Sequence, residues 1–128
     1  MQCARFQIGS DDFLMISTSP VFWQAFFDPN NPNYKKARNA IKTYDKEQII
    51  IDTITISNVL DWLYKNEKRA LIAWFLDYLT NTSNVKIFYI GKEEFEILSR
   101  IVIEKQLNFS AATLEYLHMT LHYDIAKL

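Results

Sequence analysis

The stretch FLMISTSPVFW (residues 13–23) decides the fold, because it runs from a continuous apolar segment into three hydroxyl residues and a proline. FLMIST (13–18) lacks alternation of apolar and polar residues, which is typical of a strand covered on both faces of a parallel sheet. Ligands of such sheets bind outside the carboxyl ends of the strands. We therefore expect Ser17, Thr18 and Ser19 to lie where a ligand would bind, although none of them is a carboxylate or a histidine.

Three further segments are predicted to form strands: QIIIDTI (48–54), VKIFYIG (85–91) and the beginning of DIAKL (124–128). We expect residues 13–18 to be central in the sheet, with 48–54 and 85–91 following outward on one side. Residues 124–128 are expected on the other side.

The segments between these runs have the apolar spacing of helices. Helices are expected over residues 33–44, 55–79, 92–105 and 109–122, with a break of the second one near Asn66. Strands that alternate with helices imply right-handed crossovers and a parallel sheet. The predicted fold is α/β: one three-layer α/β/α domain over residues 1–128, with its core from about residue 13 and a sheet of about four strands.

The composition excludes several classes of protein. With 128 residues, 49% of them hydrophobic, the chain is long enough for one domain with its own core. A formal net charge of −1 provides no overall attraction to nucleic acid or to an anionic membrane. The single cysteine, Cys3, cannot form an internal disulfide, so we expect a reducing, cytoplasmic location. No apolar run approaches the ~20 residues of a membrane span, and MQCARFQIGSDD lacks the apolar stretch of a signal peptide.

Three blocks of sequence carry a likeness to a known family: FLMISTSPV (13–21), TITISNVLDWL (53–63) and LNFSAATLEYL (107–117). In this order they resemble the PIN domain, a metal-dependent ribonuclease fold found in many toxin–antitoxin pairs. The resemblance extends from about residue 13 to residue 128 and implies a PIN-like (Rossmann-like) domain. It also implies pairing as a dimer, and a cleft that a segment of a protein partner often plugs.

The acidic positions of that family hold neutral residues in this chain. The resemblance places Ser17 at the first aspartate and Ala111 at the second. Asn58, or the neighbouring Ser57, stands at the glutamate. Mg²⁺ and Mn²⁺ require oxygen ligands, mainly carboxylates. We therefore predict a non-catalytic PIN-like protein (a pseudoenzyme) without a bound metal or cofactor, which binds a protein or RNA, or has a structural role, through a retained interface.

The alternative is a weak Mg²⁺- or Mn²⁺-dependent ribonuclease that uses displaced acids. Asp61 and Glu115 lie one helical turn beyond the positions of the family's glutamate and second aspartate. Asp52 and Asp12 are the remaining candidates. One turn is about 5 Å, which is too far for a ligand to keep its geometry, so we favour the non-catalytic interpretation.

Glu115, His118 and His122 share one stripe of the last predicted helix, and histidines four residues apart can bind one metal ion. Cys3 is the one further soft ligand in the chain. We therefore interpret the two histidines as surface or partner-facing residues.

Two surface features leave alternatives open. Lys35, Arg38 and Lys42 form a basic stripe that either contacts a phosphate backbone or is simply a solvated helix face. PVFWQAFF (20–27) is too apolar for a loop in water and is divided between the core and a surface for a neighbouring molecule. The predicted partner is a protein or a second copy of this chain, with RNA as the other candidate and no membrane.

Overall fold

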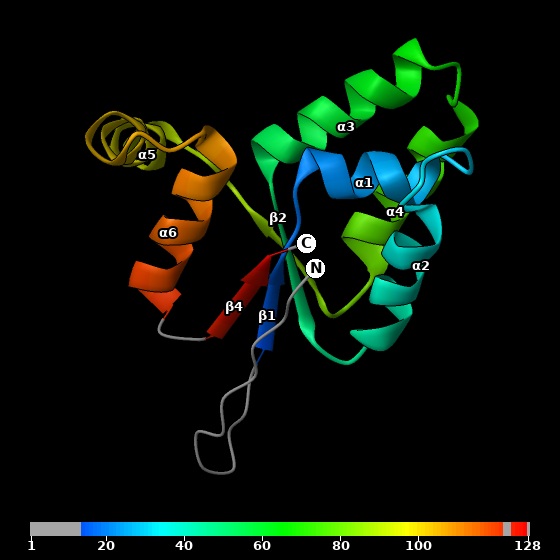
Figure 1. Cartoon of the computed structure of the whole chain (residues 1–128), viewed down its shortest axis with the longest axis horizontal. Coiled ribbons are helices and arrows are strands. Elements are labelled where there is room, and N and C mark those ends of the chain that lie inside the picture. Colours follow the sequence, from blue (N-terminus) through cyan, green and yellow to red (C-terminus); the bar gives the residue numbers. More distant parts are fainter. Residues whose placement is uncertain (1–13, 122–123, 128) are drawn as a thin grey trace.

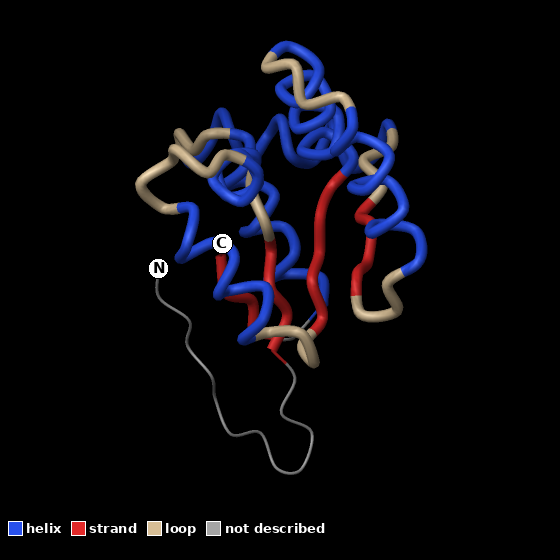
Figure 2. Tube along the Cα trace, turned by 90° about the vertical axis from the view of Figure 1, so that its right-hand side faces the viewer, coloured by secondary structure: helices blue, strands red, loops and turns tan. Residues whose placement is uncertain are grey.

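The computed structural model describes residues 14–121 and 124–127. Its strands are β1 (Leu14–Ser17), β2 (Gln48–Asp52), β3 (Val85–Phe88) and β4 (Asp124–Lys127). They lie side by side in the order β3-β2-β1-β4, and each neighbouring pair is parallel (Figure 2). The α/β class expected from the alternation of strands and helices is confirmed.

Helices lie on both sides of this sheet (Figure 1). They are α1 (Pro20–Phe27), α2 (Tyr34–Thr43), α3 (Thr53–Lys65), α4 (Ala70–Asn81), α5 (Lys92–Lys105) and α6 (Phe109–Leu121). Helices α1 to α4 pack against one face of the sheet, α6 packs against the other, and α5 packs on α6. None of the helices in the described part of the chain is both long enough and apolar enough to cross a membrane.

Side chains of successive strand residues point to opposite faces of the sheet, as the pleated backbone requires. Ile16, Ile49 and Ile51 belong to the larger hydrophobic cluster, together with apolar side chains of α1 to α4. Met15 and Ile50 belong to a second cluster, which includes residues of α6. Strands β1 and β2 thus place buried side chains on both faces of the sheet, which explains why their apolar runs are continuous rather than alternating.

The apolar stretch at residues 20–27 forms α1, and most of it is core. Ser19 caps the helix, and a proline follows in its first turn, where a missing N–H breaks no hydrogen bond. Trp23 is fully buried, and its ring centroid lies 5.1 Å from that of Phe75 in α4. Val21, in contrast, is 73% exposed. Most side chains of this stretch therefore belong to the core, and Val21 lies at the surface.

Strand β2 is shorter than the run at 48–54 predicts, because it ends at Asp52 and α3 begins at Thr53. The Asp52 carboxylate accepts the backbone N–H of Thr55 and so caps α3. Thr53 and Ile54 are β-branched, which favours a strand but does not prevent a first helical turn. The apolar pattern alone therefore extends the strand too far. Strand β3 likewise ends early, at Phe88.

The expected break of the long helical segment is confirmed and lies between α3 and α4. After the end of α3, Glu67 has a left-handed φ of 57°. The next residue, Lys68, donates its backbone N–H to the carbonyl oxygen of Leu63 at 2.8 Å. This is the Schellman arrangement, which closes a helix and turns the chain.

Candidate functional site

A small depression lies at the carboxyl end of β1, where the sequence predicts a ligand. It is lined by Ser17, Thr18, Ser19, Asp52, Ser110 and Leu114. Its volume of about 10 Å³ leaves room for about one water molecule. The residues that end β1 and β2 therefore meet the first turns of α6 with little free space between them.

Thr18 is held at the bottom of this region by hydrogen bonds within the fold. Its side chain is buried, and its hydroxyl donates to the carbonyl oxygen of Ile50 at 3.1 Å. The hydroxyl oxygen of Thr18 in turn accepts the indole N–H of Trp23 at 2.9 Å. The hydroxyl has one proton, and that proton is already in use. Thr18 therefore links α1 to β2, and its hydroxyl proton is not available to a ligand.

Asp52 is 8% exposed, and both of its carboxylate oxygens have partners. Oδ1 accepts the backbone N–H of Thr55 at 2.7 Å, and Oδ2 accepts the Thr55 hydroxyl at 2.9 Å. A negative charge at this position also interacts favourably with the positive end of the α3 dipole. Asp52 therefore begins a helix, although it lies beside Ser17 in the depression.

The structure places one of the three predicted site positions in the depression. Ser17 lines it, whereas Asn58 and the neighbouring Ser57 have exposed side chains on α3. Ala111 is half-buried in the first turn of α6, and the residue of that turn that lines the depression is Ser110. Convergence of all three positions stays a prediction. The spacing of Leu114, four residues after Ser110 on the same helix face, is the signal that could have identified Ser110.

The candidate displaced acids differ in their surroundings. Asp61 has an exposed side chain on α3. Glu115 accepts a hydrogen bond from the Lys105 ammonium of α5 at 2.5 Å. This bond, with the charge of Lys105, holds the pKa of the Glu115 carboxyl below its usual value. Asp12 lies outside the described residues, so Asp52 is the one described acid that lines the depression.

The histidine stripe of α6 is described in part. His118 has an exposed side chain, and His122 and Cys3 lie outside the described residues. Within residues 14–121 and 124–127, no three side chains of the His, Cys, Asp and Glu types lie close enough to hold a metal ion.

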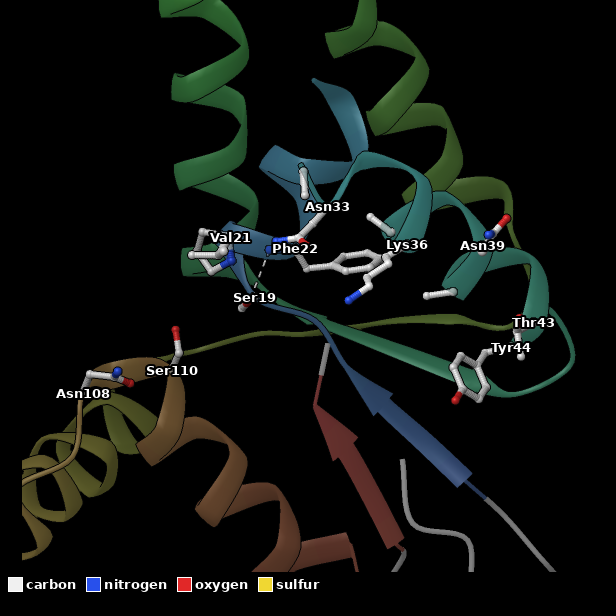
Figure 3. Close-up of a pocket in the computed structure, with 14 residues that line it drawn as sticks. Ser19, Val21, Phe22, Asn33, Lys36, Asn39, Thr43, Tyr44, Asn108 and Ser110 are labelled. Atoms are coloured by element: carbon white, nitrogen blue, oxygen red, sulfur yellow. Dashed lines mark hydrogen bonds between the residues drawn. The ribbon is translucent and has the colours of Figure 1, made fainter. Parts of the chain in front are cut away.

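A much larger groove, of about 900 Å³, lies between α1 and α2 and reaches the beginning of α6 (Figure 3). Its floor consists of apolar side chains that are largely buried: Phe22, Ala25, Ala37 and Ala40. Its polar side chains include Ser19, Lys36, Asn39, Thr43, Asn108 and Ser110. An apolar floor with a small number of polar groups around it is typical of binding sites.

The basic residues of α2 have two different roles. Arg38 donates its Nε–H to the carbonyl oxygen of Phe26 at 3.0 Å, and its guanidinium stacks on the Phe26 ring at 4.1 Å. Arg38 therefore holds α2 against α1. Lys36, which the predicted stripe leaves out, is the one charged side chain among the described residues that line the groove. The small residues Ala37 and Ala40 lie on the same face of α2 as Lys36, and they are the sequence signal that could have identified this face as the one that lines the groove.

Comparison of the chain with models of known protein families gives no match. Comparison with curated proteins gives no significant similarity either.

Proposed function

We propose that this chain is a non-catalytic binding domain with a PIN-like, three-layer α/β/α fold. The observation that carries the proposal is the pattern of hydrogen bonds at the carboxyl end of the sheet. The hydroxyl of Thr18 and both oxygens of Asp52 are buried and bound to groups of the fold itself. Polar side chains at this edge thus connect β1 and β2 to the helices that follow them.

Metal-dependent hydrolysis needs oxygen atoms that are free to bind an ion, not oxygen atoms that are already bound to groups of the fold. A site for Mg²⁺ or Mn²⁺ uses several oxygen ligands, mainly carboxylates whose lone pairs face the ion. Recruiting Asp52 to a metal would remove the cap of α3, which costs about 1 kcal/mol. The resemblance of the sequence supports the same conclusion, because Ser17, Asn58 and Ala111 stand where the family has acids.

The binding surface in this proposal is the groove between α1 and α2, and its partner is a protein or a second copy of the chain. A nucleic-acid backbone is bound mainly by several Lys and Arg side chains that contact successive phosphates. Lys36 is the one such side chain among the described residues that line the groove, and Arg38 is engaged with Phe26. A largely apolar floor favours a protein partner instead.

Thermal unfolding with and without millimolar Mn²⁺ tests the non-catalytic assignment. A ligand that binds the folded state raises the melting temperature. We expect no increase for the purified chain, and no Mn²⁺-dependent cleavage of a labelled single-stranded RNA. A melting temperature that rises with Mn²⁺ and returns with EDTA, together with cleavage, would support the alternative, a ribonuclease with displaced acids.

A further inference from the structure

We propose that the groove between α1 and α2 is also a site for a small molecule, a straight-chain carboxylic acid of medium length. The carboxylate pairs with Lys36, and the hydrocarbon chain lies along the apolar floor. This inference rests on the groove as the proposed binding surface. It adds a ligand that controls access to that surface, because an acid in the groove excludes a protein partner from it.

The charge pattern of the groove selects the head of this ligand. Lys36 is the one charged side chain among the described residues that line the groove. It is exposed and has no acidic partner among the described residues. Figure 3 shows its side chain extending along Phe22, with the amine in the opening of the groove. A single cation in an otherwise neutral site matches a ligand with one negative charge, whereas a nucleic-acid strand carries a charge on every nucleotide.

Further groups around the groove favour the same head. Ser19 and Ser110 line it where α1 and α6 begin, and the dipoles of both helices are positive at these ends. The Ser19 hydroxyl accepts the backbone N–H of Phe22 at 3.3 Å, so that its own proton can be donated to a carboxylate. Helix α2 contains no acidic residue that would repel one.

The length of the groove sets the length of the hydrocarbon chain. Its lining residues on α2 continue from Lys36, in the first turn, to Tyr44, which follows the last turn. Eight helical residues rise by about 12 Å, and an extended chain of about ten carbons, at about 1.25 Å per carbon, has this length. The small side chains of Ala37 and Ala40 leave an open volume of about 900 Å³ above them. This volume lies within the range of small-molecule sites.

Isothermal titration calorimetry with a series of straight-chain carboxylates tests the proposal. The even-numbered acids from hexanoate to tetradecanoate are titrated into the wild-type chain below their critical micelle concentrations. Decanoate should bind at one site per chain. From hexanoate to decanoate, Kd should fall about three- to fourfold for each added CH₂ group, because each of them is buried on the floor. Longer acids should gain little more, because their ends extend beyond the groove.

Reversal of the charges tests the head of the ligand. Lys36→Glu should weaken the binding of decanoate at least about tenfold, because it replaces attraction by repulsion. The same variant should bind decylammonium more tightly than the wild type does. Lys35→Glu makes the same charge change outside the groove lining and should alter either Kd by less than about twofold. Circular dichroism and the melting temperature of each variant verify that it is folded.

Three results would overturn the proposal. The first is the absence of binding by millimolar decanoate. The second is binding of many acid molecules per chain, or a Kd that keeps falling to tetradecanoate, either of which indicates detergent-like association with the surface. The third is an equal effect of Lys36→Glu and Lys35→Glu on the Kd of decanoate. Each of these results leaves the Mn²⁺ titration unchanged, so failure of this inference can be distinguished from failure of the proposed function.

Discussion

The depression at the end of β1 and the groove between α1 and α2 share Ser19 and Ser110, yet they use their polar groups differently. In the depression, Thr18 and Asp52 are buried and bonded to the fold. In the groove, side chains such as Lys36 are exposed and face a large volume. Polar residues at a strand end thus mark a ligand site only when their hydrogen-bonding capacity is still available.

The largest effect on stability is expected from Asp52→Ala. The change removes the cap of α3 and leaves the buried N–H and hydroxyl of Thr55 without their acceptors. Loss of the cap and of these hydrogen bonds should lower the free energy of unfolding by about 2–3 kcal/mol. Urea unfolding measures this value. Asp61→Ala, an exposed acid on the same helix, should change it by less than about 0.5 kcal/mol. Equal effects of the two substitutions would contradict a structural role for Asp52.

Thr18→Val should have the next largest effect. Valine has nearly the same shape, but it leaves the buried indole N–H of Trp23 without an acceptor. A buried unsatisfied donor costs about 1–2 kcal/mol in the free energy of unfolding. Thr43→Val in the groove is the matched control and should be nearly neutral, because Thr43 is exposed. If Thr43→Val destabilises the chain as much as Thr18→Val does, the contrast between the two regions is wrong.

Much of this contrast lies beyond what the sequence can predict. Continuous apolar runs such as the one ending at Ser17 are sufficient to predict an α/β fold and buried strands. The roles of Asp52 and Lys36 depend instead on where a strand ends or which way a helix faces, and a shift of one residue changes either. A single step along a helix rotates the side chain by about 100°, so that packing decides whether Lys35 or Lys36 faces the groove. Likewise, whether Asp52 caps a helix or binds a ligand depends on where β2 ends.

A smaller effect, of opposite sign, is expected at Glu67, which belongs to neither region. Its left-handed φ of 57° strains any residue with a Cβ atom. Glu67→Gly should therefore raise the free energy of unfolding by about 0.5–1 kcal/mol. Lys65→Gly, in the last turn of α3, should lower it by a similar amount, because glycine disfavours the helical conformation. Thermal unfolding of the two variants gives the comparison, and a loss of stability in both would show that this turn is not strained.

The smallest effect on stability is expected from the loss of the ion pair between Glu115 and Lys105. Because its pKa is lowered in the folded state, the unfolded chain binds a proton there more readily. The contribution to stability is therefore fully present above the unfolded pKa of the carboxyl and is lost as the pH falls through its lower folded pKa. Glu115→Gln should remove this part of the acid dependence of the melting temperature. An unchanged acid dependence would mean that the pair does not form in solution.

The central claim, that Asp52 is a structural residue of a non-catalytic domain, is tested most directly by one double comparison. The melting temperatures of the wild-type chain and of Asp52→Ala are measured in EDTA and in millimolar Mn²⁺. Because Asp52 is hydrogen-bonded to Thr55, we expect Asp52→Ala to lower the melting temperature by the same amount in both buffers. We expect Mn²⁺ to leave the melting temperature of either protein unchanged. Stabilisation of the wild type by Mn²⁺ that Asp52→Ala abolishes would make Asp52 a metal ligand and would contradict the account.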